Sequence, residues 1–321
     1  MLADAREPIP DDPRGLLDPA LAAALDRLDV ASTRMFAGRL PGERRSKRRG
    51  RSVEFDDFRP YASGDDLRFL DWNVFARFDR LVVKLFRDEQ DLAVHVGVEL
   101  SRSMAAGSPR KDVAASRLGA AIATLALRRQ NRVGLSAITP AGVRTHPPAR
   151  GRRQTEPALA FMHRVLVESA EASLAREAPS MPEAARRIAR THARDQGMVV
   201  IISDLLVRDE LAGVLDAFAA GGRHDVHALH MLSPDELDPS LASERGLRGD
   251  LRLSDAESPA AAEVTITPRL LEAYQRRLAR FQQDCERLCR SRGITRTPIT
   301  SADEPAELIF GTLRNRGLLK A

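Results

Sequence analysis

Oxygen-bearing side chains follow two apolar segments of this sequence, at the point where each segment ends. The first segment runs directly into Glu99, Ser101 and Ser103, and the second runs into Asp204. If both segments are parallel strands, these side chains converge at the carboxyl edge of a sheet, where open α/β sheets bind their ligands. Carboxylate and hydroxyl oxygens in that arrangement suit Mg²⁺, which keeps several waters and leaves a position for a partner's carboxylate. The spacing therefore indicates binding and recognition before catalysis.

Sequence signatures of catalysis are missing. The chain has no nucleophile elbow, phosphate-binding glycine loop, dinucleotide fingerprint or paired zinc-binding histidines. His224, His227 and His230 recur every three residues, whereas side chains on one face of a strand recur every two. We therefore predict a protein that is not an enzyme, with no catalytic residue and no cofactor other than Mg²⁺.

The composition is that of an ordinary globular protein. Of the 321 residues, 43% are hydrophobic and 30% are charged, which is enough apolar material for one large core or two smaller ones. Only 4% are aromatic, which argues against surfaces that stack sugars or single-stranded nucleic acid. The two cysteines form no disulfide framework, and no signal-peptide pattern or apolar membrane span is present. We therefore expect a cytoplasmic protein.

Positive charge is concentrated in one segment. The net charge of the chain is +5, and residues 34–51 hold eight basic side chains against one acidic side chain. The stretch bounded by Arg44 and Arg51 contains nothing apolar, which favours an exposed, poorly ordered loop. The alternative is a nucleic-acid-associated protein whose phosphate contacts come from this stretch and from three further arginines, Arg150, Arg152 and Arg153.

Apolar periodicity divides the chain into three parts. Residues 1–30 end in a short helical pattern and form an N-terminal extension, and residues 31–91 hold the basic loop and a small β-rich subdomain. Residues 92–321 alternate apolar strands with amphipathic helices, which predicts a doubly wound, mainly parallel α/β sheet. Strands that are apolar throughout are buried on both faces, so we expect residues 92–98 to form a central strand and Ile201 to lie in its neighbour.

The elements expected in the α/β part follow from the same patterns. They are strands at 92–98, 133–138, 143–145, 198–202, 226–232 and 294–300, and helices at 111–129, 156–168, 182–194, 209–220, 271–288 and 305–316. Cys285 lies in the apolar stripe of the helix at 271–288, and no further soft ligand accompanies Cys289. We therefore expect both thiols to pack in the core rather than bind a metal.

A cluster of charges lies among aromatic residues in the second part of the chain. Tyr61, Phe69 and Trp72 are interleaved with five charged residues, Asp65, Asp66, Arg68, Asp71 and Arg77. Charges that lie next to large aromatic side chains are normally paired. We therefore predict a buried ion-pair network with a structural role rather than acid–base chemistry.

These residues belong to a longer series that resembles a known family. The series comprises Gly50-Arg51-Ser52-Val53-Glu54-Phe55, Arg59-Pro60-Tyr61, Gly64-Asp65-Asp66, Arg68, Asp71-Trp72-Asn73, Ala76-Arg77, Glu99-Leu100-Ser101-Arg102-Ser103-Met104 and Ile202-Ser203-Asp204. It resembles the bacterial domain-of-unknown-function 58 family over roughly residues 35–310. The resemblance implies a von Willebrand factor A-like domain with a Rossmann-like fold, encoded beside a MoxR-type AAA+ ATPase.

The resemblance also implies a metal-ion-dependent adhesion site that holds Mg²⁺. The usual motif reads Asp-x-Ser-x-Ser, followed by a distant threonine and then an aspartate. Ser101 and Ser103 match the paired serines, Thr155 is the candidate threonine, and Asp204 matches the final aspartate. With Glu99 at the first position, these residues form the predicted metal site.

The first motif position departs from the pattern, because Glu99 stands where aspartate is usual. The extra methylene moves the carboxylate by about a bond length, which octahedral Mg²⁺ tolerates poorly. Arg102, beside the loop, can instead replace the cation by pairing with Glu99 or Asp204. The function implied by the resemblance is that of a non-enzymatic adaptor. It would work with a MoxR-type AAA+ ATPase in the assembly or maturation of a client protein.

Overall fold

The computed structural model describes most of the chain, in two units. The described residues are 8–31, 54–87, 92–172, 180–192, 197–207, 210–220, 222, 224–240, 250–254, 261–265 and 267–320. One unit comprises Met1–Met35 and Leu92–Ala321, and the other, Phe36–Asp91, is inserted between those two segments. The basic stretch between Arg44 and Arg51, predicted to be an exposed loop, lies outside the described residues.

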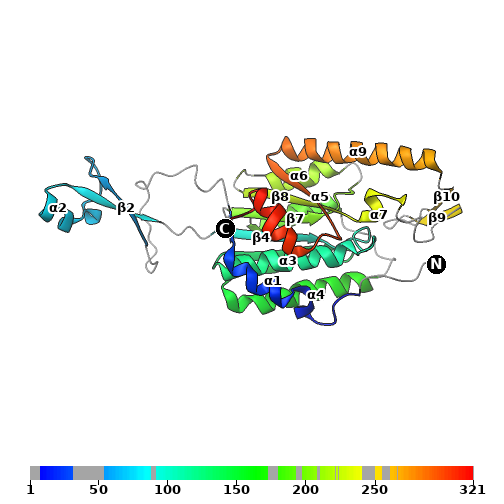
Figure 1. The fold of residues 1–321 in the computed structure, drawn as a ribbon, viewed down its shortest axis with the longest axis horizontal. Helices are drawn as coiled ribbons and strands as arrows, with labels where there is room; N and C mark the ends of the chain where they lie inside the picture. The colour runs from blue at the N-terminus through cyan, green and yellow to red at the C-terminus, as the bar shows by residue number, and fades with distance from the viewer. Residues whose placement is uncertain are drawn as a thin grey trace. The chain divides into compact units, whose positions relative to one another are not determined.

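A six-stranded sheet forms the centre of the larger unit (Figure 1). Its strands in spatial order are β11 (Ile294–Thr300), β8 (His224–Leu232), β7 (Gly197–Ser203), β4 (Ala93–Glu99), β5 (Arg132–Thr139) and β6 (Gly142–Arg150). Neighbouring strands are parallel from β11 to β5, and β6 pairs antiparallel with β5 at one edge. This arrangement confirms the predicted doubly wound, mainly parallel sheet. The edge strand expected at 143–145 is longer and reaches Arg150.

The central strand is β4, as its continuous apolar run predicts. Every residue of β4 is buried, and the strand pairs with β7 on one side and β5 on the other. Gly97 lies opposite Ile201 of β7, as expected for neighbouring strands. A Cβ atom on Gly97 would come within 2.8 Å of Ile201 Cδ1, so a larger residue here would make the end of the Ile201 side chain shift.

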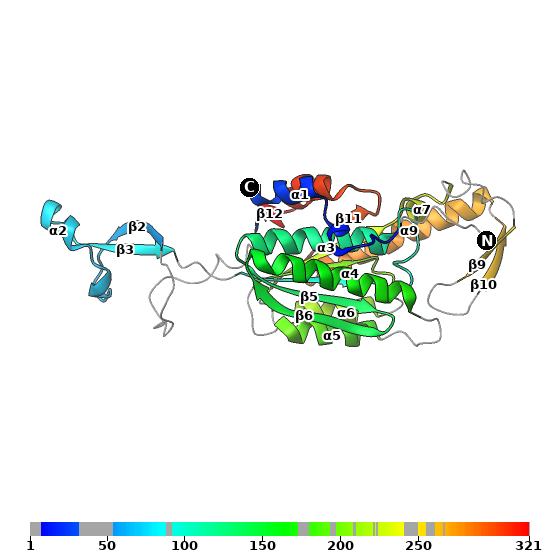
Figure 2. The same cartoon turned by 90° about the horizontal axis from the view of Figure 1, so that it is seen from below.

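Helices cover both faces of the sheet (Figures 1 and 2). One face carries α3 (Lys111–Arg128) and α4 (Thr155–Glu171), and the other carries α5 (Met181–His192), α6 (Leu211–Ala219) and α9 (Pro268–Arg290). Successive strand residues point to opposite faces of the sheet, so alternate side chains pack into two separate cores.

The two cores divide the strand residues between them. Val96 and Val98 of β4 pack in the core beneath α3 and α4. Ile201 of β7 packs in the other core, which also contains Cys285 and Cys289 of α9. Both cysteines are fully buried, which confirms the predicted packing role of these thiols.

The N-terminal segment packs against the α/β part of the chain. Leu16, Leu21 and Leu25 are buried in the core formed by α3 and α4. They come from η1 (Pro13–Leu16), α1 (Pro19–Ala24) and η2 (Leu25–Arg27). The 3-10 turn η1 is capped by Asp12, whose side chain accepts a hydrogen bond from Gly15 N at 3.0 Å.

The N-terminal and C-terminal segments of this unit lie side by side (Figures 1 and 2). The strand β1 (Asp29–Val30) pairs antiparallel with β12 (Leu319–Lys320). Before β12, the expected helix at 305–316 is present, with a π-helical turn within it. Its parts are α10 (Pro305–Glu307) and η6 (Leu308–Leu313).

Several short elements were not anticipated from the sequence. They are η5 (Arg152–Gln154), α7 (Pro234–Leu237) and an antiparallel hairpin of β9 (Asp250–Ser254) and β10 (Ala261–Thr265). None of the helices in the described part of the chain has the length and apolar character needed to cross a bilayer. Of the arginines proposed as phosphate contacts, Arg152 pairs with Asp26 at 3.2 Å.

The smaller unit is built around an antiparallel strand pair. The strands β2 (Glu54–Pro60) and β3 (Val82–Arg87) pair with an irregularity between Phe55 and Asp57. Between them lie η4 (Leu67–Phe69) and α2 (Trp72–Phe78). Asp71 caps α2 by accepting a hydrogen bond from Asn73 N at 2.8 Å.

Four of the five charged residues of this cluster form ion pairs, but the prediction that the cluster is buried is wrong for most of it. Its ion pairs are Arg59–Asp65 at 2.5 Å, Arg68–Asp66 at 2.5 Å and Lys84–Asp71 at 3.0 Å. Of these aspartates, Asp71 alone is buried, and the interleaved aromatic side chains of Trp72 and Phe78 are 60% and 68% exposed. Two strands and one short helix have too little apolar area to enclose both the charges and the aromatic residues.

Candidate functional site

Loops from four neighbouring strands meet at the carboxyl edge of the main sheet. These loops follow β4, β7, β8 and β11. Leu100 N donates to Ile138 O at 2.8 Å, and Ser301 N donates to Leu232 O at 3.0 Å, so the backbone ladders continue past the strand ends. The Ser301 hydroxyl also donates to Pro109 O at 2.7 Å, which joins the loop after β11 to the loop after β4. These bonds hold the edge as one connected surface.

Glu99, the last residue of β4, is the acceptor of a hydroxyl cluster. The Ser101 hydroxyl donates to Glu99 Oε1 at 2.7 Å and lies 2.9 Å from Ser103 Oγ. From the neighbouring strand β7, the Ser203 hydroxyl donates to Glu99 Oε2. Glu99 is buried, while Ser101 and Ser103 are half-buried. The structure therefore brings Glu99, Ser101 and Ser103 together, as predicted, and adds Ser203 to them.

Asp204 lies in the loop after β7 and pairs with a buried lysine. Lys111 Nζ donates to Asp204 Oδ2 at 2.9 Å and to Glu236 Oε1 at 2.5 Å. The side chains of Lys111 and Asp204 are 0% and 1% exposed. Lys111 thus supplies a positive charge to Asp204.

Local folding fixes the positions of Lys111 and Glu236, which form the second of these ion pairs. Lys111 is the first residue of α3, and Glu236 belongs to α7. A capping box holds α7, in which Ser233 N donates to Glu236 Oε2 at 2.7 Å and Glu236 N donates to Ser233 Oγ at 3.3 Å. Gly107, with φ +93°, lets the loop after β4 pass against Ser233, because a Cβ there would lie 2.5 Å from Ser233 Cβ. This close approach brings α7 to the start of α3.

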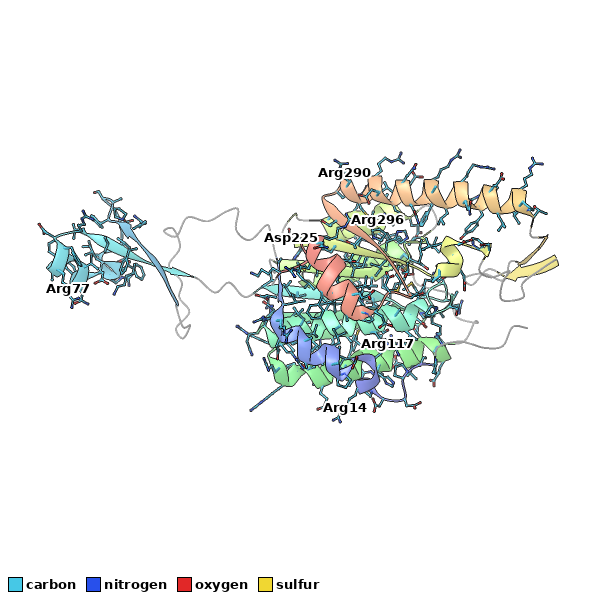
Figure 3. All side chains as sticks on the ribbon, viewed as in Figure 1. Arg14, Arg77, Arg117, Asp225, Arg290 and Arg296 are labelled. Atoms are coloured by element: carbon cyan, nitrogen blue, oxygen red, sulfur yellow. The ribbon has the colours of Figure 1, made fainter. Side chains whose placement is uncertain are left out.

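Burial and neighbouring charges set the protonation states around the pair. Burial acts to lower the pKa of Lys111, but attraction to Asp204 and Glu236 outweighs it, and the pKa is raised. His230 of β8 behaves oppositely, since burial and then the adjacent Arg296 lower its pKa to about 4. Arg296 of β11 (Figure 3) donates from Nε to His230 Nδ1 at 2.9 Å, which requires an unprotonated Nδ1. At neutral pH the edge therefore carries a charged lysine and a neutral histidine.

The structure does not bring Thr155 to this site, which corrects the five-residue set. Thr155 begins α4 just after β6, whose last residue, Arg150, pairs with Arg132 at the amino end of β5. The other end of α4 reaches the site, where Ser169 Oγ donates to Leu100 O at 2.9 Å. At 1.5 Å per helical residue, Thr155 lies about 20 Å from that end. The physical reason is the antiparallel direction of β6, which returns the chain to the opposite edge before α4 begins.

The side chains present fit a Mg²⁺ site poorly. Of the five predicted ligands, Thr155 lies at the other edge and Asp204 is paired with Lys111. The remaining cluster has the Ser101 and Ser203 hydroxyls donating to the carboxylate of Glu99, so its oxygens already satisfy one another. Among the described residues, no three His, Cys, Asp or Glu side chains are arranged to hold a metal ion. Mg²⁺ needs near-octahedral oxygen ligands at 2.0–2.1 Å, which this arrangement does not offer.

The sheet order and the helices on both faces define the class of protein as a doubly wound, mainly parallel α/β domain. Residues 57–284 match the family described as "Protein of unknown function DUF58", and the chain belongs to this family. Over 308 residues it is 31% identical to the uncharacterized protein Rv1480 of Mycobacterium tuberculosis, covering 94% of this chain and 92% of that protein. The uncharacterized protein Mb1516 of Mycobacterium bovis matches with the same identity and coverage.

Solved structures that resemble the chain share little sequence with it. The conserved hypothetical protein BatB from Bacteroides thetaiotaomicron gives a TM-score of 0.42 at 14% identity, covering 70% of this chain and 98% of that chain. A von Willebrand factor type A protein from Catenulispora acidiphila gives a TM-score of 0.38 at 15% identity, with coverages of 74% and 44%.

Sequence reasoning missed two residues of the edge that carry charge, Lys111 and Glu236. A sequence signal for Glu236 exists, because Ser233-Pro234-Asp235-Glu236 follows a strand and has the spacing of a capping box. Lys111 has no comparable local signal, since a lysine at the start of a helix is normally exposed. Its burial depends on two carboxylates that come from distant parts of the chain.

Proposed function

We propose that the chain is a protein-interaction module that presents the carboxyl edge of its sheet to a partner protein and catalyses no reaction. One observation carries the proposal: polar side chains from separate strand ends are fixed against one another, and two of them, Ser101 and Ser103, are only half-buried. A rigid polar edge on an α/β scaffold suits recognition, because little ordering of side chains is needed when a partner binds.

The chemistry of the edge supports recognition over catalysis. General acid–base catalysis requires a side chain that can exchange a proton with a substrate near the working pH. The carboxylate of Glu99 accepts two hydroxyls, Asp204 is held by Lys111, and Nδ1 of His230 is held by Arg296. Burial raises the pKa of Cys285 to about 12, which keeps that thiol from acting as a nucleophile.

The partner we propose is a MoxR-type AAA+ ATPase or the client protein on which that ATPase acts. Support comes from the family to which the chain belongs. Resemblance to this family implies that a gene for such an ATPase lies beside the gene for this chain. In this proposal the chain is an adaptor in the assembly or maturation of the client.

Binding to the purified ATPase encoded nearest to this gene tests the proposal. The variant Ser103→Tyr places a large side chain on the half-buried edge, and we expect it to weaken binding at least about tenfold, the equivalent of roughly 1.4 kcal/mol. The control is Ser291→Tyr, an exposed position between α9 and β11 at the opposite edge of the sheet, which should bind as the wild type does. Equal affinity of the two variants, or no binding by the wild type to the ATPase or its client, would contradict the proposal.

A further inference from the structure

The ammonium group of Lys111 occupies the centre of the carboxyl edge. It lies between two carboxylates that belong to different loops, with Asp204 Oδ2 at 2.9 Å and Glu236 Oε1 at 2.5 Å. Nζ has three donors, and two of them are used by these charge-assisted hydrogen bonds. Since the lysine side chain is fully buried, its charge lies inside the folded structure and not on the surface.

We propose that Lys111 is a built-in cation that takes the place of a divalent metal at this edge, so that the site works without Mg²⁺. The inference concerns cation binding alone. It can therefore fail while the proposed interaction function holds, or hold while that function fails.

Electrostatics gives the first reason. A buried carboxylate must be paired, and Lys111 already supplies the pairing charge of Asp204. A divalent cation close to Asp204 would also lie close to the ammonium. Repulsion between like charges a few ångströms apart amounts to several kcal/mol at the effective dielectric constant of a protein site. Metal binding at Asp204 therefore requires Lys111 to leave.

Geometry gives the second reason, because the backbone that carries Lys111 is held in place. Its backbone N–H donates to Ala106 O at 3.4 Å, and the next residue, Asp112, donates to Met104 O at 2.8 Å. The same loop is held against Ser233 at Gly107. The lysine stem thus starts from a fixed backbone position and ends between two fixed carboxylates.

The cluster around Glu99 gives the third reason. Ser101 and Ser203 direct their hydroxyl protons at the carboxylate, so hydrogen bonds within the chain stabilise the Glu99 carboxylate. A metal would need the serine oxygens turned toward it and their protons turned away from Glu99. Both acidic residues of the predicted metal site, Glu99 and Asp204, are therefore satisfied by groups of this chain.

Removing the lysine side chain should convert the edge into a true cation site. In Lys111→Ala the space between Asp204 and Glu236 is left with two facing carboxylates and room for a hydrated divalent ion. The matched variant is Lys111→Met, which fills that space with an uncharged side chain of similar length. In the double variant Lys111→Ala/Asp204→Asn, one of the two carboxylates is lost.

The experiment measures melting temperatures of the full chain in EDTA and in millimolar Mg²⁺, Mn²⁺ or Ca²⁺. We expect the wild type to melt at the same temperature in every condition. Lys111→Ala should melt lower in EDTA and recover by about 5 °C or more at a cation concentration a hundredfold above its Kd. Lys111→Met and the double variant should show no recovery.

Calorimetric titration of the wild type with Mg²⁺ and Mn²⁺ keeps the test decisive if Lys111→Ala does not fold. No saturable heat supports the built-in cation. Saturable binding that is lost in Ser103→Ala would overturn the proposal, because a metal would then occupy the edge together with Lys111. The proposal would also be overturned if Lys111→Ala folds and its melting temperature is the same with and without each of the three cations.

Discussion

Glu99 and Ser203 are joined by a hydrogen bond that crosses from β4 to β7, with the serine hydroxyl donating to Oε2 of the glutamate. The same hydroxyl accepts a hydrogen bond from Leu205 N at 2.9 Å. This relationship gives a physical reason for a glutamate, rather than the shorter aspartate, at position 99. The longer side chain lets one carboxylate serve Ser101 in its own loop and Ser203 on the neighbouring strand.

Shortening Glu99 should therefore destabilise the protein. In Glu99→Asp the carboxylate no longer reaches Ser203, and we expect a loss of about 1–3 kcal/mol in the free energy of unfolding, measured by urea denaturation. Ser203→Ala, made in the wild type and in Glu99→Asp, completes a double-mutant cycle. If the two substitutions add without interaction, the bond between Glu99 and Ser203 contributes nothing to stability and this explanation fails.

Gly107 should tolerate no side chain, since it combines a positive φ with close contact to Ser233. We expect Gly107→Ala to cost about 2–4 kcal/mol, from left-handed backbone strain together with overpacking. Gly142→Ala is the control, because Gly142 has φ +114° but nothing within 4 Å of the added Cβ. Gly142→Ala should cost about 1–2 kcal/mol from strain alone. Equal losses in thermal unfolding would show that the contact with α7 is unimportant.

Stability should fall in mild acid because of His230. Burial and Arg296 lower its folded-state pKa from 6.5 to about 4, so the unfolded chain binds the proton more tightly than the native protein does. The contribution of His230 is present in full above pH 6.5 and is lost as the pH falls from 6.5 toward 4, by about 3 kcal/mol in total. Asp204 and Lys111, which also lie near the ring, act in opposite directions on this pKa.

Denaturant unfolding at a series of pH values checks the effect of His230. In His230→Gln the side-chain amide oxygen can still accept from Arg296 but does not titrate, so the acid dependence should become shallower. Some dependence should remain, because burial also lowers the pKa of His227. His146→Gln, in β6, leaves the pair of His230 and Arg296 intact and should keep the full slope. An unchanged slope in His230→Gln would refute the prediction.

The two cysteines should be unreactive in the native protein. Burial raises the pKa of Cys285 to about 12 and that of Cys289 to about 11. At pH 8 alkylation by iodoacetamide, followed by mass spectrometry, should be at least about a hundredfold slower than for an exposed thiol. Arg290→Cys supplies that exposed thiol on the outer side of α9, next to Cys289 (Figure 3). Labelling of the native cysteines at the rate of the introduced thiol would show that α9 is not packed as described.

Much of the fold follows from local sequence patterns. The apolar runs of β4 and β7 identify the central strands, because strands buried on both faces need continuous apolar side chains. The three- and four-residue spacing that includes Cys285 identifies the buried side of α9. The convergence of Glu99, Ser101 and Ser103 also follows, since they lie within five residues of the end of one strand.

The predictions that were wrong or missing concern features that depend on contacts between distant parts of the chain. Thr155 is a candidate ligand only because it lies between the serines and the aspartate in the order of the motif. Its location depends on the direction of β6, which no local sequence pattern predicts. The burial of Lys111 depends on Asp204 and Glu236, which reach it from two other loops. The exposure of Trp72 depends on how much apolar surface its own small unit can cover, which is a property of the assembled unit.

The pairing of β1 with β12 has a consequence for synthesis of the protein on the ribosome. Among the described strands β1 is translated first and β12 last, so the α/β unit has its longest-range strand contact only after residue 320 has emerged. Phe36–Asp91, in contrast, is continuous in sequence, and its strands β2 and β3 are available to each other early. Contacts between distant residues form slowly, whereas local units fold as they appear. The small inserted unit can therefore complete its structure while the carboxyl edge with Lys111 is still unassembled.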